Sequence, residues 1–263
     1  MNRTSISDLK LEAKDQLLGN YGIATGSLAL LFVLLYSLMT IVTTAVTGVG
    51  VSGQNPNPII DQSTITGQLA MNVLSAVLAA ISAVLSTGYT YVIRRIADGE
   101  KAAVSDLFYV FRHHPDKVVI VSLIMTGIQI LLLLPATFAG NGGFVTGDAA
   151  SLDLAGFDGK KFLIWLLLYL AGFIASFIID MYLAMTFQIY LDDNDETVTN
   201  IISRSISLMK GNVLRYFYLL LSFVGYYLLI LLSIGIAALW VIPYQTMAIV
   251  KFYYSIRDEV HEC

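Results

Sequence analysis

The chain contains six apolar runs long enough to cross a lipid bilayer as helices, and these runs limit its fold more than any other feature. A helix needs about 20 apolar residues to cross the hydrocarbon core. Hydrophobic residues make up 57% of the 263 residues and charged residues only 13%, against about 25% charged in soluble domains. We therefore predict an all-α membrane protein with six transmembrane helices, at about 23–46, 69–93, 118–135, 162–190, 213–234 and 236–254.

The basic residues support this number of spans and give an orientation. Lysine and arginine near the ends of spans collect on the cytoplasmic side of a membrane. With six spans, all of the 15 basic residues except Lys160 and Lys161 fall on the same side as both termini. We therefore expect one integral membrane domain over residues 1–263, a multi-pass protein of the cell membrane with both termini in the cytoplasm.

Three short segments outside the spans share a pattern of an apolar residue, a hydroxyl, a short acid or amide, and a second apolar residue. They are Ile6-Ser7-Asp8-Leu9, Val104-Ser105-Asp106-Leu107 and Val198-Thr199-Asn200-Ile201. We expect each hydroxyl to cap a helix that ends at a breaker pair, 19–20, 115–116 or 211–212. The pattern predicts three parallel repeats, at about 5–96, 97–196 and 197–257, each a cytoplasmic amphipathic helix followed by a transmembrane hairpin. The alternative is chance, since these residues are common at helix ends.

The helical period assigns an apolar face to each of these amphipathic helices. The faces consist of Ile6, Leu9, Ala13 and Leu17 in the first, Val104, Leu107, Phe108 and Phe111 in the second, and Val198, Ile202, Ile206 and Met209 in the third. We expect these helices to lie at the membrane surface, with the breakers turning the chain into the bilayer.

Several segments resemble a known family. In the last third they are Tyr190-Leu191-Asp192-Asp193-Asn194, Ser207-Leu208-Met209-Lys210-Gly211-Asn212 and Leu239-Trp240-Val241-Ile242-Pro243-Tyr244. The leader, with Leu18-Gly19-Asn20-Tyr21-Gly22, is similar as well. These segments resemble bacterial integral membrane proteins grouped as domain-of-unknown-function family 975. The resemblance implies a bacterial cytoplasmic-membrane protein with about six spans, and it carries over no catalytic residue.

Four polar residues within the predicted spans are candidates for ligand binding. Asp180 lies in an apolar run, where carboxylates often face a cavity, a proton path or a partner. We favour the alternative that a long, tilted fourth span brings Asp180 to the inner headgroups. Gln129 and Gln245 can line a polar path, although interhelical hydrogen bonding explains them more simply. Tyr226 lies in mid-span, where an interfacial aromatic belt does not account for it.

The sequence contains no pattern typical of catalysis or metal binding. The acidic run 192–196 lacks the ligand spacing of a calcium loop, and acids before a helix favour the helix dipole. The single cysteine, Cys263, excludes an intrachain disulfide and a cysteine metal cluster. We find no phosphate-binding glycine loop, nucleophile elbow or HExxH motif. We therefore expect no catalytic residue, no metal, no cofactor, no nucleic-acid partner and no enzyme activity.

These observations favour a helical bundle that contacts membrane lipids and binds or transports a lipid-like or small amphiphilic molecule. The candidate residues are Asp180, Gln129, Gln245 and Tyr226. The alternative is a structural or immunity-type membrane protein that acts through a protein partner. A membrane-embedded hydrolase is a third hypothesis, and it lacks a motif.

Overall fold

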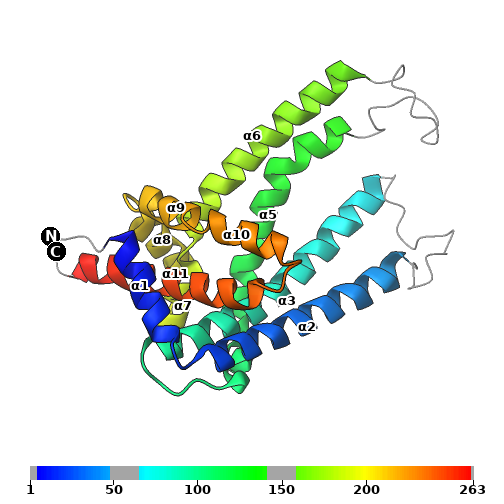
Figure 1. Ribbon diagram of the computed structural model, residues 1–263. Coiled ribbons are helices and arrows are strands. Elements are labelled where there is room, and N and C mark those ends of the chain that lie inside the picture. The colour runs from blue at the N-terminus through cyan, green and yellow to red at the C-terminus, as the bar shows by residue number, and fades with distance from the viewer. Residues whose placement is uncertain (1–4, 48–64, 141–157, 262–263) are drawn as a thin grey trace. The chain divides into compact units, whose positions relative to one another are not determined.

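The computed structural model describes residues 5–47, 65–140 and 158–261, and the regular structure in these ranges is helical. Helices suit an apolar chain because they satisfy their own backbone polar groups where water is absent. In chain order the helices are α1 (Ile6–Leu17), α2 (Tyr21–Thr47), α3 (Ile65–Ala97), the 3₁₀ helix η1 (Val104–Phe108), α4 (Tyr109–Arg112), α5 (Pro115–Gly140), α6 (Gly159–Leu183), α7 (Thr186–Asp192), α8 (Val198–Met209), α9 (Val213–Leu221), α10 (Val224–Leu232) and α11 (Ala238–His261) (Figure 1).

Within the described residues, five segments are long and apolar enough to cross a membrane. They are Tyr21–Thr44, Thr66–Ala97, Pro115–Gly140, Gly159–Asp192 and Val213–Leu232. Each overlaps one of the first five predicted spans, so the all-α membrane class agrees with the sequence. The sixth predicted span, 236–254, overlaps α11, which contains Pro243, Gln245 and Lys251 and is not among the five. The sixth crossing stays a prediction.

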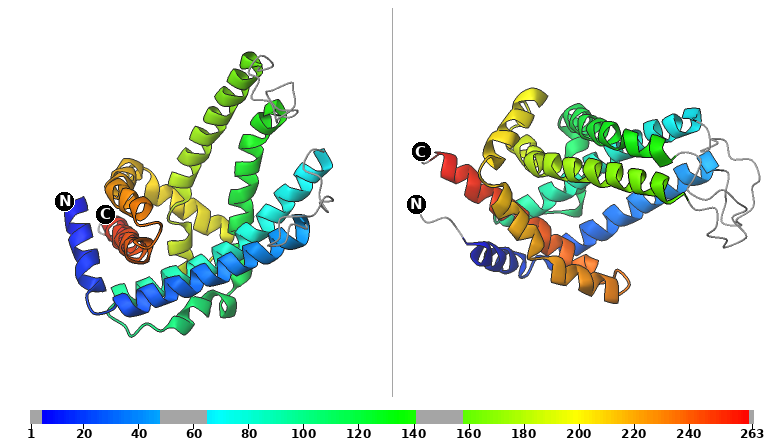
Figure 2. Two further views of the ribbon diagram at one scale, coloured as in Figure 1. Left: turned by 45° about the vertical axis from the view of Figure 1, so that its right-hand side comes forward. Right: turned by 90° about the horizontal axis from the view of Figure 1, so that it is seen from above.

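The chain divides into two compact units, each of which has its own packing. The first consists of residues 1–40, 80–121 and 181–263, and the second of residues 41–79 and 122–180. In the first unit α1 lies beside α11 (Figure 1), and α10 and α11 form an antiparallel pair joined by a short turn (Figure 2). Leu9, Ala13 and Leu17 of the apolar face predicted for α1 are buried in the core of this unit.

In the second unit α5 and α6 pack closely. A Cβ atom placed on Gly172 of α6 would lie only 2.7 Å from the backbone oxygen of Leu132 in α5. Small residues permit such close approach of helices in membranes. Gly172 therefore lets the backbones of α5 and α6 come together, which brings the polar side chains of these two helices within reach of each other.

In each amphipathic segment the observed N-cap lies two residues before the predicted one. The predicted capping residues are Ser7, Ser105 and Thr199, and the observed N-caps are Ser5, Ala103 and Thr197. At the first segment, Ser5 Oγ accepts a hydrogen bond from the backbone N–H of Asp8 at 3.2 Å. All three N-caps have extended backbone, so the shared sequence pattern has a shared local geometry.

The middle segment differs from its predicted apolar face. Leu107 and Val110 are fully buried, whereas Phe108 is 39% and Phe111 50% exposed. The segment begins as a 3₁₀ helix and continues as a short α-helix, so it does not follow the single period of 3.6 residues that the prediction assumed. Val104 of the predicted face is also 40% exposed.

The third segment, α8, also turns a different face to the protein. Ile201, Ser205 and Met209 are buried, whereas Ile206 of the predicted face is 43% exposed. Ser205 Oγ donates a hydrogen bond to the backbone oxygen of Tyr182 at 2.9 Å. This bond fixes the rotation of α8 against the end of α6 and leaves Ile206 on the outside.

A residue in the left-handed region precedes α2, α5 and α9. These residues are Gly19, His114 and Gly211, with φ of 87°, 49° and 93°. The breakers predicted at the two glycines are confirmed, because glycine adopts this backbone without a Cβ clash. In the middle segment the left-handed residue is His114, and Pro115 occupies the first position of α5, where its missing N–H is not needed.

Candidate functional site

Two of the four predicted residues, Asp180 and Gln129, form a polar pair between α6 and α5. The Nε2 atom of Gln129 lies 3.2 Å from both carboxylate oxygens of Asp180. Both side chains are half-buried. The other charged residues described in the second unit are Asp158, Lys160 and Lys161, at the opposite end of α6. The amide is therefore the polar partner of this carboxylate in an otherwise apolar stretch.

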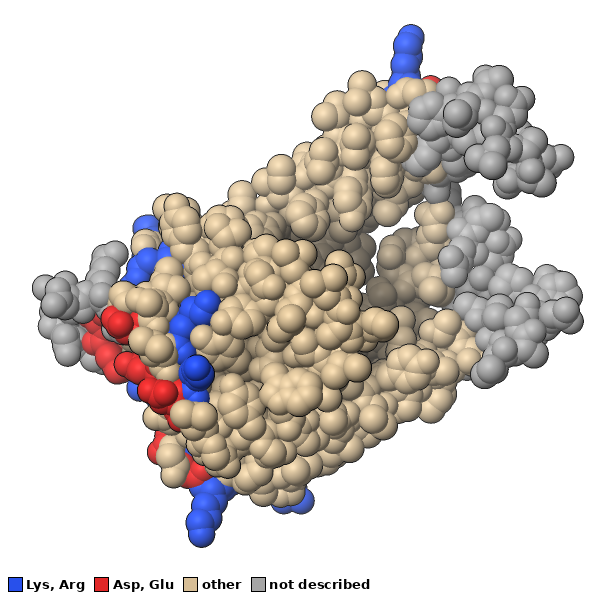
Figure 3. All heavy atoms as spheres, viewed as in Figure 1, with Lys and Arg blue, Asp and Glu red and all other residues tan. Residues whose placement is uncertain are grey.

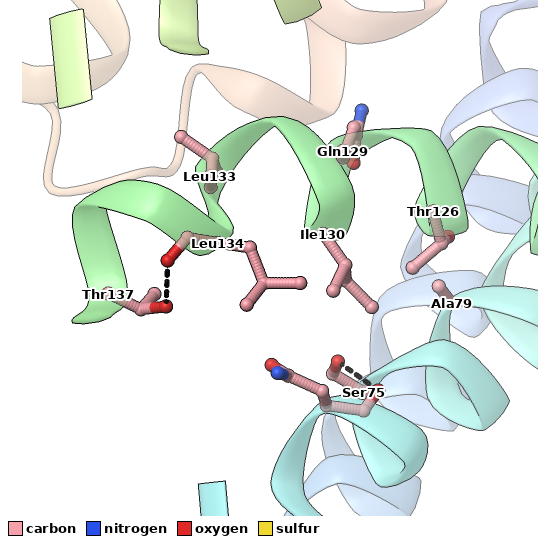
Figure 4. A pocket seen from close by; sticks show the side chains of 9 residues that line it. Ser75, Ala79, Thr126, Gln129, Ile130, Leu133, Leu134 and Thr137 are labelled. Carbon is pink, nitrogen blue, oxygen red and sulfur yellow. Dashed lines mark hydrogen bonds between the residues drawn. The ribbon is translucent and has the colours of Figure 1, made fainter. Parts of the chain in front are cut away.

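A cavity of about 370 Å³ lies between α3 and α5, within the second unit. Figure 4 shows Ile130 and Leu134 pointing into it from α5, opposite Ser75, while the amide of Gln129 points away from Ser75. The hydroxyl of Ser75 donates to a carbonyl of its own helix at 2.8 Å, and that of Thr137 does so at 2.7 Å. The cavity is thus lined by aliphatic and neutral polar groups and carries no charge of its own.

A second cavity, the aromatic groove, lies in the first unit and contains the predicted residue Tyr226. Its volume is about 320 Å³, within the range of small-molecule sites. The groove is lined by Lys14 of α1, Tyr21 of α2, Tyr226 and Leu229 of α10, and Trp240, Val241 and Tyr244 of α11. Its walls are apolar and aromatic, and Lys14 is the one charged side chain in this lining.

Aromatic rings that pack edge to face form the wall of the aromatic groove. The ring of Tyr244 meets Phe223 at 5.2 Å and Tyr226 at 5.8 Å, both edge to face. From α1, Lys10 places its ammonium group 4.6 Å from the ring centre of Phe223 and donates to the backbone oxygen of Ser222 at 3.2 Å. Burial lowers the pKa of Lys10. The aromatic wall is therefore braced by a cation and does not depend on a ligand for its shape.

The fourth predicted residue, Gln245, lies beside this groove in sequence but does not line it. Its Oε1 atom accepts a hydrogen bond from the hydroxyl of Tyr227 at 2.8 Å. The bond joins the N-terminal third of α11 to the middle of α10. Gln245 thus makes an interhelical hydrogen bond, which was the simpler of the two roles considered for it from the sequence.

Of the seven residues that line the aromatic groove, sequence reasoning selected only Tyr226 and missed six, among them Lys14, Trp240 and Tyr244. The spacing of these residues along their helices could have indicated them. Lys10 and Lys14 are four residues apart in α1, as are Trp240 and Tyr244 in α11, so each pair shares a face of its helix. The pairing of those two faces across α1 and α11 depends on the fold and is not visible in the sequence.

The carboxylate of Asp192, at the end of α7, accepts hydrogen bonds from the ends of two other helices. Arg94 of α3 and the hydroxyl of Tyr253 of α11 both donate to it, and Arg257 lies 3.5 Å away. Arg94 also donates to the backbone oxygen of Gln188 at 2.7 Å. Asp192 therefore serves as an anchor between α3, α7 and α11.

Charged and apolar surfaces are separated in the first unit. Figure 3 shows blue and red side chains gathered over α1 and the C-terminal part of α11, whereas the surface over α10 is tan. On α10, Leu228, Leu231 and Leu232 are 59%, 75% and 82% exposed. A surface this apolar is costly in water. It is suited to contact with lipid.

The helical fold, its apolar surfaces and the five long apolar segments indicate a membrane protein. The chain belongs to the family described as "Protein of unknown function (DUF975)", whose model matches residues 1–260. The match agrees with the resemblance found in the sequence. Comparisons with curated proteins and with solved structures gave no match.

Proposed function

We propose that this protein binds or moves a lipid-like or small amphiphilic molecule, and that the aromatic groove is where it binds. The observation that carries the proposal is the composition of the groove. The groove has aromatic and aliphatic walls and a volume of about 320 Å³, and its lining includes one exposed cation, Lys14. Such a lining matches a molecule that has an apolar body and a polar end.

The charge of Lys14 indicates the chemistry of the polar end. A lysine ammonium donates three hydrogen bonds and attracts an anion such as a carboxylate or a phosphate. Trp240 and Tyr244 are typical of the level of the headgroups, where one end of a ring is wet and the other apolar. The ligand is therefore an amphiphile with an acidic head, either a membrane lipid or a free acid with an alkyl chain.

Quenching of Trp240 fluorescence tests this proposal directly. Trp165→Phe leaves Trp240 as the single tryptophan of the chain. This protein is placed in phosphatidylcholine vesicles and titrated with brominated phosphatidylglycerol or, separately, with a brominated fatty acid. Specific binding gives quenching that saturates at a low fraction of the acidic probe, and the probe that saturates first identifies the source of the ligand.

Two charge variants give the control. Lys14→Gln, in the groove, should weaken the binding of either acidic probe about tenfold, which corresponds to about 1.4 kcal/mol. Lys160→Gln, at the start of α6, should leave binding unchanged. Quenching that rises in proportion to the probe and is equal in all variants would rule out the groove as a binding site. A polypeptide that copurifies while no amphiphile is retained would favour a partner protein instead.

The proposed architecture has six crossings in three parallel repeats, with both termini in the cytoplasm of a bacterial cell. Three correspondences support it: the N-caps before each pattern, the left-handed residue before α2, α5 and α9, and the meeting of α3, α7 and α11 at Asp192. The antiparallel pairing of α10 and α11 supports α11 as the return crossing. One contact differs from the surface position expected for α1, because Lys10 of this helix donates to the backbone oxygen of Ser222, within the fifth predicted span.

We propose a binding or transport role without catalysis, metal or cofactor. The basis is the chemistry of the two cavities, whose linings contain neutral polar, apolar and aromatic groups together with Lys14. Neither lining contains a nucleophile adjacent to a base, which covalent catalysis uses. Incubation with lipid and peptide substrates, followed by mass spectrometry, would overturn this part of the proposal if a cleaved product formed.

A further inference from the structure

We propose that Asp180 and Gln129 form a proton-binding site within the membrane, in which the carboxyl group takes up and releases one proton. This inference concerns α5 and α6 of the second unit and does not depend on the aromatic groove. It rests on three observations: the depth of the pair along its helices, the geometry of its hydrogen bonds, and the distance of other charges.

Gln129 lies well inside its helix, far from the charged start of α5. Gln129 is about 12 residues beyond Lys117 in α5, or about 18 Å along the axis, at a rise of 1.5 Å per residue. Asp180 lies one turn before the end of α6 at Leu183. Because Gln129 contacts Asp180, the carboxylate lies at a similar depth, which is inside a hydrocarbon layer about 30 Å thick. The hydrogen bond between the two residues therefore argues against the headgroup position that we favoured for Asp180 from the sequence.

The hydrogen bonds of the pair suit a carboxyl group in either of its two states. Gln129 Nε2 lies 3.2 Å from each oxygen of Asp180, so the amide donates to the ionised group. When the carboxyl group gains a proton, it also becomes a donor, and the amide oxygen of Gln129 is the matching acceptor. A neutral acid facing an amide thus forms two complementary hydrogen bonds, and release of the proton breaks only one of them.

Among the residues that the structure describes in the second unit, the other charged side chains lie far from the pair. In the described part of the second unit, the charged groups other than Asp180 are Asp158, Lys160 and Lys161, about 29 Å or more away along α6. The described segments of α2, α3 and α5 in this unit, 41–47, 65–79 and 122–140, contain no charged side chain. The titratable Tyr169 of α6 is about three turns away and stacks between Trp165 and Phe173. With no cation from these elements beside it, a proton is the species that neutralises Asp180 at low cost.

The neighbouring cavity provides a route for that proton. Gln129 belongs to the lining of the 370 Å³ cavity between α3 and α5, together with Asn72 and Thr126. These neutral polar groups can hold water, which carries protons along hydrogen bonds. Gln129 thus stands between this cavity, to whose lining it belongs, and the carboxyl group that its amide contacts.

Infrared spectroscopy of the full-length protein in phosphatidylcholine vesicles tests the inference. A protonated carboxyl group has a carbonyl-stretch band that is separate from the bands of an ionised carboxylate. The difference spectrum between wild type and Asp180→Asn should contain the band of the protonated acid at neutral pH and carboxylate bands only at strongly alkaline pH. A difference spectrum with carboxylate bands alone at neutral pH would overturn the proposal.

Two further variants keep the test decisive if Asp180→Asn does not fold. Gln129→Leu retains the acid but removes its amide partner, so the acid band should move to higher frequency because a hydrogen bond to the acid is lost. Asp116→Asn, which removes an exposed carboxylate at the start of α5, should change carboxylate bands only. An acid band that is identical in wild type and in Gln129→Leu would contradict the pairing.

Discussion

The guanidinium group of Arg94 donates a hydrogen bond to the carboxylate of Asp192, a residue 98 positions further along the chain. The Arg94 side chain is 10% exposed and that of Asp192 17%, so water solvates neither charge fully. Tyr253 and Arg257 of α11 approach the same carboxylate. One carboxylate therefore connects the ends of α3, α7 and α11, three helices that the sequence alone does not bring together.

Replacing Asp192 by Asn should destabilise the first unit strongly. The change leaves the guanidinium of Arg94 largely buried without a counter-charge, which typically costs about 3 kcal/mol or more. Titration with sodium dodecyl sulfate from mild detergent measures the free energy of unfolding. Combining Asp192→Asn with Arg94→Gln should cost less than the sum of the two changes, because the charges are coupled.

An exposed ion pair gives the control for this prediction. Glu100 pairs with Arg95 at 3.0 Å, but its side chain is 60% exposed, and exposed pairs contribute about 0–1 kcal/mol. Glu100→Gln should therefore change the free energy of unfolding by less than about 1 kcal/mol. Equal losses for Glu100→Gln and Asp192→Asn would show that Asp192 is an ordinary surface charge.

Gly88→Ala should disrupt the packing of α3 against η1. A Cβ atom at this position would lie 1.9 Å from the backbone oxygen of Leu107, and a backbone atom cannot move aside as a flexible side chain does. Overpacking of this kind costs about 1–3 kcal/mol, and we expect the upper end in the same detergent titration. Gly127→Ala in α5, where nothing lies within 4 Å, should be neutral or stabilising.

The helices could be predicted from the sequence because lipid imposes length and apolarity on them, but contacts between helices could not. Asp180 and Gln129 were each recognisable as polar residues in apolar runs. Their pairing depends on how α5 packs on α6, which Gly172 permits. The aromatic groove was visible only through Tyr226, since its other walls come from α1, α2 and α11.

The sequence pattern identified the three amphipathic segments but predicted the wrong residues as their N-caps. The pattern of apolar residue, hydroxyl, acid or amide and apolar residue marked all three amphipathic segments, yet every cap is two residues earlier. In each pattern the last apolar residue is buried: Leu9, Leu107 and Ile201 are 2%, 0% and 0% exposed. These contacts with the rest of the first unit are not visible in the capping residues of the pattern.

Ser5→Ala and Ser7→Ala distinguish the observed cap of α1 from the predicted one. Ser5 Oγ accepts from the N–H of Asp8, and loss of such a cap costs about 1 kcal/mol. The Ser7 hydroxyl contacts only that of Ser5, at 2.7 Å, among the hydrogen bonds described for it. We expect the thermal unfolding midpoint to fall for Ser5→Ala and to change little for Ser7→Ala. The reverse order would restore the predicted cap.

The side of the membrane on which the chain ends decides between five and six crossings. With the N-terminus in the cytoplasm, six crossings return the C-terminus to the cytoplasm, whereas five leave it outside. The single cysteine, Cys263, allows the test without any added residue. A membrane-impermeant thiol reagent should label it in inside-out vesicles and not in intact spheroplasts.

Lys160→Cys, made in a Cys263→Ser background, provides the control. Residue 160 lies on the opposite side in the six-span topology, so this cysteine should be labelled in spheroplasts. Labelling of Cys263 in spheroplasts would mean that α11 does not cross, and the charged C-terminal part of α11 would then lie outside, against the bias of basic residues toward the cytoplasm.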